Sequence, residues 1–136
     1  MVCQFNGNCC SIVDGYFFPV GFGAGIRNGN RRNRGTNEFT TLNAAFTAIN
    51  AGTHQGVITV AITGNTTEPA TAVPLLKSAA PSSYTSISIK PSGGNWTINS
   101  AAAPTGSRGI IELNGADNVT IDGDDPGIAG TRNLTF

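Results

Sequence analysis

Short runs of alternating hydrophobic and polar residues recur along the C-terminal part of the chain. Two of them lie in residues 110–123, one with Ile111 and Leu113 on its apolar face and one with Val119 and Ile121. Successive side chains of a strand point to opposite faces of a sheet, so each run predicts a half-buried strand. Asn114-Gly115 separates the two strands, and Asp122-Gly123 supplies the residues of a turn after the second.

The spacing of the apolar strand centres carries a second signal. Ile111 lies 22 residues after Ile89, Ile121 lies 23 residues after Ile98, and Leu134 lies 23 residues after Ile111. Repeats of about 20 to 30 residues are typical of solenoids, in which each turn buries its apolar face on the next turn. The spacing therefore predicts a parallel β-coil with stacked turns.

A helical pattern precedes most of these strands. Apolar residues recur there at intervals of three and four, which predicts a helix of about three turns with Thr40 or Thr41 as N-cap and Gly52 as its stop. The polar residues Asn43, Thr47 and Asn50 are expected on the solvent face. The apolar stripe comprises Phe39, Leu42, Ala45, Phe46 and Ile49.

The segments after the helix divide into strands and crossings. Val57–Thr63 is predicted as a strand that buries Ile58, Val60 and Ile62. Residues 66–84 contain three prolines and are expected to cross the surface without a central strand.

Two segments resemble a known family. Gly115–Gly123 (GADNVTIDG) is similar to the turn signature of pectin-lyase-like right-handed parallel β-helices, and residues 39–63 resemble the start of secreted bacterial members. The resemblance covers residues 36–136. It implies an all-β fold, a right-handed parallel β-helix (solenoid) with one N-terminal capping α-helix. Residues 1–35, with clustered cysteine, glycine and arginine, are predicted to form an irregular N-terminal arm.

Composition favours a β-rich protein outside the cell. Charged residues make up 12% of the chain, about half the usual ~25%, and there are 18 glycines. The formal net charge is zero, which gives no overall field for nucleic acid. No run of about 18 apolar residues is present, so no membrane span is expected. A secretory signal is not visible, which conflicts with the extracellular expectation without refuting it.

Histidine and cysteine do not form a recognisable site. Cys3, Cys9 and Cys10 have no histidine nearby, so a zinc site is not expected. His54, the only histidine, lies in a predicted loop without a nucleophile beside it, and it is expected to be solvated.

The acidic residues after the predicted strand at 119–121 have two interpretations. Asp122, Asp124 and Asp125 could act in glycoside or polyuronide cleavage or bind calcium, as the resemblance allows. The density of aspartate and glycine favours a turn instead. No catalytic residue, metal or other cofactor is therefore predicted, with calcium as the alternative.

Two further sets of residues are candidates for glycans. Trp96 and Tyr84 could stack on sugar rings, although Trp96 is equally suited to fill the interior. Asn118 and Asn133 belong to N-x-[ST] sequons, and they could instead stack as an asparagine ladder. The full set of sequon asparagines is Asn65, Asn95, Asn118 and Asn133.

The preferred functional hypothesis is a non-catalytic extracellular structural module at the cell surface. It would continue its coil into a neighbouring subunit or a longer chain and build a fibre or adhesive stalk, as a homo-oligomer or head-to-tail filament. Cell-surface polysaccharide is a second expected partner. The alternatives are the N-terminal part of a polysaccharide lyase or glycoside hydrolase, and a carbohydrate-binding module. The expected assembly residues are Arg27, Arg31, Arg32, Arg34, Asp122, Asp124, Asp125, Leu134 and Phe136.

Overall fold

The computed structural model describes residues 10–14, 38–104, 106, 108–125, 127–128 and 132–136. Ten strands and one helix are assigned in this part of the chain. In chain order they are β1 (Cys10–Asp14), β2 (Glu38–Phe39), α1 (Leu42–Asn50), β3 (Gln55–Ile62), β4 (Thr66–Glu68), β5 (Leu75–Leu76), β6 (Ser83–Pro91), β7 (Trp96–Ser100), β8 (Leu113–Asn114), β9 (Val119–Ile121) and β10 (Leu134–Thr135).

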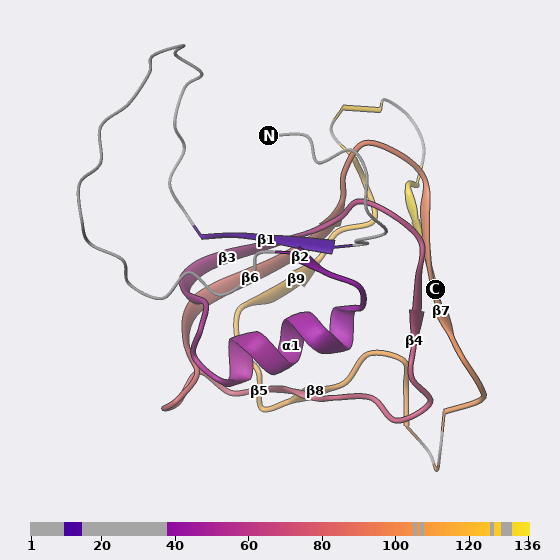
Figure 1. Ribbon diagram of the computed structural model, residues 1–136. Helices are drawn as coiled ribbons and strands as arrows, with labels where there is room; N and C mark the ends of the chain where they lie inside the picture. Colours follow the sequence, from indigo (N-terminus) through magenta and orange to yellow (C-terminus); the bar gives the residue numbers. More distant parts are fainter. Residues whose placement is uncertain (1–9, 15–37, 105, 107, 126, 129–131) are drawn as a thin grey trace.

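The strands form three small sheets that lie on three sides of α1 (Figure 1). The largest has the order β2-β1-β3-β6-β9, the second is β10-β7-β4, and the third is β5-β8. Pairing among β3, β6 and β9 is parallel, as it is throughout the two smaller sheets. β1 pairs antiparallel with both β2 and β3.

The prediction of a right-handed parallel β-helix is wrong. The strands are mostly short and belong to separate sheets, and within the described ranges no sheet closes or curls. The predicted repeat fails because its strand centres do not pair: Ile89 pairs with Ile121 instead of Ile111. Leu134 pairs with Trp96, and Ile98 pairs with Thr66. The expected parallel pairing of short strands is present in all three sheets, but the expected stacking of these strands into a solenoid is absent from the described residues.

The core lies between the three sheets and is filled from one end by α1. Leu42, Ala45, Phe46 and Ile49 are fully buried, which confirms four of the five residues of the predicted apolar stripe. The fifth, Phe39, lies on β2 and not on the helix, and it is only partly buried. The helix begins after Thr41, whose hydroxyl accepts from the backbone N–H of Ala44 at 3.1 Å.

Gly52 ends the helix with a left-handed φ of 74°. A Cβ there would lie 2.2 Å from the carbonyl oxygen of Pro81, so both the backbone conformation and the space require glycine. The predicted stop is therefore confirmed.

The strand predicted at Val57–Thr63 is confirmed as part of β3, with Ile58, Val60 and Ile62 fully buried. The prediction for residues 66–84 is wrong, because this segment contains the strands β4 and β5 and begins β6. Leu75 and Glu68 are completely buried within it. Both short strands lie at edges of their sheets, and Pro69, Pro74 and Pro81 all lie outside the strands, so none of them interrupts one.

Candidate functional site: an open end of the core

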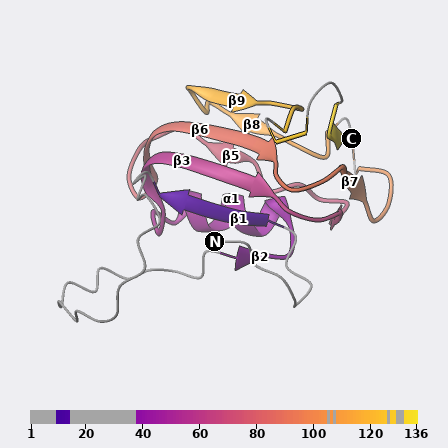
Figure 2. The same ribbon diagram turned by 90° about the horizontal axis from the view of Figure 1, so that it is seen from above.

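The two ends of the core, along the direction in which strands pair, are built differently. Figure 2 shows β1 and β2 at one end and β8 and β9 at the other, with α1 near β1. We call the first the covered end. The second, formed by the last strand of each sheet (β8, β9 and β10), is the open end.

At the covered end, the side chain of Asn50 replaces a neighbouring strand for β5. Its Nδ2 donates to the carbonyl of Pro74 at 2.9 Å, and its Oδ1 accepts from the N–H of Leu76 at 3.0 Å. Asn43 is buried, so the prediction that it faces solvent is wrong. Its Oδ1 accepts a hydrogen bond from the N–H of Val73 at 3.1 Å. The helix therefore satisfies backbone groups that a free sheet edge would expose.

Glu68 of β4 holds the helix at this end. Its Oε1 accepts from the N–H of Leu42 at 2.8 Å, and its Oε2 accepts from the N–H of Asn43 at 2.9 Å. The first N–H groups of a helix have no partner within the helix, and a negative charge there interacts favourably with its dipole. A fully buried carboxylate thereby connects β4 to α1. The sequence analysis missed this residue, because no local pattern links Glu68 to a helix start 26 residues earlier.

At the open end, side chains that face the core are partly exposed to solvent. Val60, Ile89 and Ile121 are register neighbours on β3, β6 and β9, and their exposures are 0%, 0% and 42%. The paired residues Leu75 and Leu113 on β5 and β8 show the same step, from 0% to 48%. Each exposed side chain continues a buried row, so a further layer of chain would bury it.

The backbone of β9 is also unpaired on its outer side among the described residues. The carbonyl of Asn118 accepts from Ile87 at 3.0 Å, and the N–H of Asp122 donates to Ile89 at 2.8 Å, so these groups face β6. Backbone polar groups of successive strand residues point to opposite sides. Those of Val119 and Ile121 therefore point away from β6, towards the open edge.

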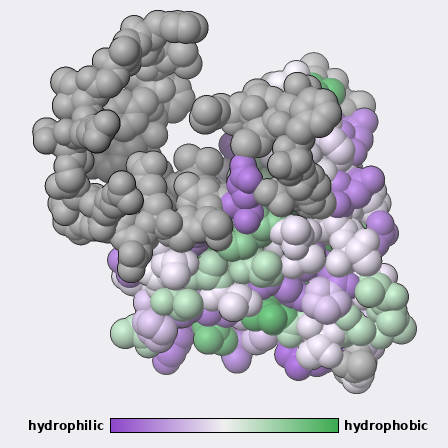
Figure 3. Space-filling view, in the orientation of Figure 1, coloured by the Kyte–Doolittle hydropathy of each residue, from purple (hydrophilic) through white to green (hydrophobic). Residues whose placement is uncertain are grey.

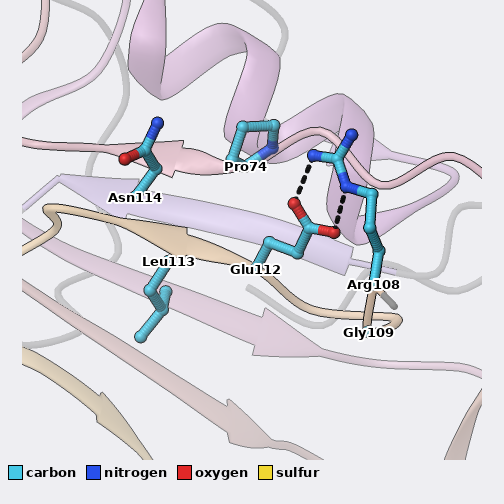
Figure 4. Close-up of a pocket in the computed structure, with 6 residues that line it drawn as sticks. All are labelled: Pro74, Arg108, Gly109, Glu112, Leu113 and Asn114. Carbon is cyan, nitrogen blue, oxygen red and sulfur yellow. Dashed lines mark hydrogen bonds and ion pairs between the residues drawn. The ribbon is translucent and has the colours of Figure 1, made fainter. Parts of the chain in front are cut away.

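A shallow groove lies beside β8. Figure 4 shows Arg108 and Glu112 paired across it while Leu113 points away. Arg108 Nε donates to Glu112 Oε1 at 2.6 Å, and Nη2 donates to Glu112 Oε2. This hydrogen bonding lowers the pKa of Glu112 and raises the pKa of Arg108. The pair neutralises itself, so it leaves no net charge for a ligand. The lining residues are Pro74, Arg108, Gly109, Glu112, Leu113 and Asn114.

Two of the three candidate aspartates, Asp122 and Asp125, accept hydrogen bonds from backbone N–H groups. Asp122 Oδ1 accepts from the N–H of Asp124 at 3.0 Å, as in a tight turn. Asp125 is buried, and its carboxylate accepts from Gly93 at 2.7 Å and from Gly127 at 2.9 Å. These contacts agree with the turn interpretation. The described ranges contain no group of three or more His, Cys, Asp or Glu residues able to hold a metal ion.

Three of the sequon asparagines precede the strands of the second sheet. Asn65, Asn95 and Asn133 come directly before β4, β7 and β10. Asn65 Oδ1 accepts from the N–H of Thr97 at 2.9 Å, and Asn133 Nδ2 donates to Asn95 Oδ1 at 2.6 Å. A ladder therefore forms at this corner, but Asn133 stacks on Asn95 and not on Asn118.

The other predicted residues are dispersed. Tyr84 is buried and donates its hydroxyl to the carbonyl of Leu76 at 2.7 Å, and burial raises its pKa. It therefore offers no open ring face to a sugar. Trp96 is half-buried against the core, and its Nε1 donates to Ser92 at 3.0 Å. His54 is 1% exposed and its ring meets Phe39 edge-on, so the solvated histidine expected from the sequence is wrong.

The predicted assembly residues are only partly placed. Phe136 is 56% exposed beside β10, whereas Leu134 on β10 is buried. Arg27, Arg31, Arg32 and Arg34 lie outside the described residues, as do Cys3 and Cys9. Figure 3, which views the molecule from the side of α1 and β1, shows small hydrophobic areas interspersed with hydrophilic ones on the described surface.

Comparisons with family models, curated proteins and solved structures give no match. The resemblance to the pectin-lyase-like superfamily therefore stays a prediction. No helix in the described part of the chain has the length and apolar character needed to cross a membrane.

Proposed function

We propose that this protein is a non-catalytic structural module that acts outside the cell and is extended by pairing of further strands at its open end. The observation that carries the proposal is the step in exposure from Ile89 to Ile121, from 0% to 42%, within one row of the core. Leu113 repeats it on a second sheet. Full burial of a wholly exposed side chain of this size contributes about 1.5 to 3 kcal/mol, and since Ile121 and Leu113 are 42% and 48% exposed, covering them contributes roughly half of that for each.

Free strand edges favour the same conclusion. An uncovered edge pairs readily with another strand, and soluble proteins usually protect it with lysine, proline, a bulge or a covering segment. The strand β9 reads Val119-Thr120-Ile121 and carries neither lysine nor proline, so its short length of three residues is the one protective feature that it has. At the other end of the core, α1 and Asn50 provide such cover.

A non-catalytic role is supported by the engagement of the acidic side chains. Asp122 and Asp125 accept hydrogen bonds from nearby backbone N–H groups, and Glu112 is paired with Arg108. The location outside the cell is supported by a low charged fraction of 12%.

The proposal is tested by sedimentation of the purified chain over a range of concentrations. We expect self-association that Ile121→Lys abolishes, because a charge on the edge strand opposes further pairing. Val57→Lys is the matched control: Val57 is also exposed, at 54%, but lies on the internal strand β3 of the same sheet. A chain that stays monomeric at every concentration, or equal association of both variants, would contradict the proposal.

Catalysis is tested separately with polyuronides and neutral polysaccharides as substrates. We expect no cleavage products. Cleavage that disappears in Asp122→Asn or Asp124→Asn would favour a polysaccharide-degrading enzyme instead.

A further inference from the structure

The covered end is not equipped to receive the open end of another copy. β1 already pairs along β3 from Ile58 to Ile62, and Asn50 occupies the backbone groups of β5. A head-to-tail filament requires two different receptive surfaces on each copy. In a head-to-tail stack, β8 would meet an edge of β5 whose backbone groups Asn50 already occupies, and β9 would meet β1 and the two-residue β2 instead of β3. Contact between two open ends avoids both mismatches.

We propose that the open end binds the open end of a second copy about a twofold axis, with β9 antiparallel to β9. This inference rests on the proposed function and names its partner. Contacts of this kind are isologous: the same surface is used by both copies and the assembly stops at two.

The backbone of β9 restricts the register, and pairing of all three residues of the strand selects one. In an antiparallel pair, residues that exchange two hydrogen bonds alternate with residues that exchange none. Val119 and Ile121 carry the outward groups, so each must lie opposite an outward residue of the other copy. A twofold axis through Thr120 meets this requirement. It places Val119 of each copy opposite Ile121 of the other, and the two Thr120 residues opposite each other in a non-hydrogen-bonded pair.

Charge and hydrophobicity are compatible with this register. It places Asp122 opposite Asn118 of the second copy, so no two carboxylates face each other across the strands. Val119 and Ile121 point to the core side of the sheet, in register with the buried Ile87 and Ile89. Antiparallel pairing brings these two apolar side chains together on the face that lacks cover.

The register is tested by the substitution Thr120→Cys in a chain whose own cysteines are replaced by serine. A non-hydrogen-bonded antiparallel pair has its Cα atoms about 4.5 Å apart, within the range of about 4.4 to 6.8 Å that a disulfide spans. Mild oxidation should therefore yield a covalent dimer. Ser88→Cys is the matched control, since Ser88 lies beside Thr120 in register but one strand further in.

We expect Thr120→Cys to yield at least ten times as much covalent dimer as Ser88→Cys. In sedimentation, the protein without the introduced cysteine should have the mass of two chains. Monomers throughout would overturn this inference and the proposed function together. Larger, open-ended oligomers that Ile121→Lys disrupts, without cross-linking through Thr120→Cys, would overturn the twofold dimer alone and leave the proposed function standing.

Discussion

Glu68 provides a sharp prediction because one buried carboxylate holds α1 against β4. Both of its oxygens accept backbone N–H groups, at 2.8 and 2.9 Å, and the residue is 0% exposed. In Glu68→Gln, one oxygen remains as an acceptor while the new NH2 group faces an N–H donor. A hydrogen bond to a charged group contributes about 1.5 to 3 kcal/mol, and a favourable charge at a helix N-terminus about 0.3 to 1 kcal/mol.

The loss of one such bond and of the charge predicts that Glu68→Gln lowers the free energy of unfolding by about 2 to 4 kcal/mol. Urea unfolding followed by circular dichroism at neutral pH measures this change. Glu112→Gln is the control, since it removes a carboxylate that pairs with Arg108 near the surface, and we expect a much smaller effect. A Glu68→Gln protein within about 0.5 kcal/mol of the original would refute the reasoning.

Three further predictions concern single positions. Gly52→Ala should lower the free energy of unfolding by more than about 1 kcal/mol in urea titrations, because φ is 74° and Pro81 leaves no space for a Cβ. Asn133→Ala should cost about 1 to 3 kcal/mol, since its buried amide bonds to two segments, and Asn133 should stay unglycosylated in a eukaryotic host. The carboxyl of Glu112 should titrate in NMR below its ordinary pKa of 4.5, and Arg108→Gln should restore the ordinary value.

The pH dependence of stability tests the Glu112 prediction further, and a second glycine provides a comparison for Gly52→Ala. The Glu112 contribution to stability should be complete above its ordinary pKa and be lost as the pH falls through its lowered folded pKa, because only the ionised carboxylate pairs with Arg108. An unshifted titration would show that the pair is not formed. Gly56→Ala provides a comparison for Gly52→Ala, since φ there is 78° but no atom lies within 4 Å of an added Cβ, so only the conformational part of the cost should appear.

Local patterns predicted those elements whose signals lie within a few residues. The N-cap Thr41, the stop at Gly52 and the stripe from Leu42 to Ile49 are all contained in one short segment, and each is confirmed. The buried face of β3 was equally accessible, because alternation directly reports which side of a strand is apolar.

Features that depend on distant segments could not be predicted in the same way. The spacing argument counted Ile111 as a strand centre, but it lies just before the strand β8, and loops of unequal length separate the strands that pair. Glu68 and Asn50 look like ordinary polar residues until the fold brings them to a helix start and a sheet edge. The burial of His54 and Tyr84 likewise follows from packing that the sequence does not reveal.

The most direct test of the open end is hydrogen exchange at the amides of β9, measured at low and at high protein concentration. The account predicts that the Val119 and Ile121 amides exchange rapidly in dilute solution and become protected as the concentration rises. The Thr120 amide, which faces β6, should be protected in both conditions. Rapid exchange of Val119 and Ile121 at every concentration would contradict the claim that this edge is a site for strand pairing.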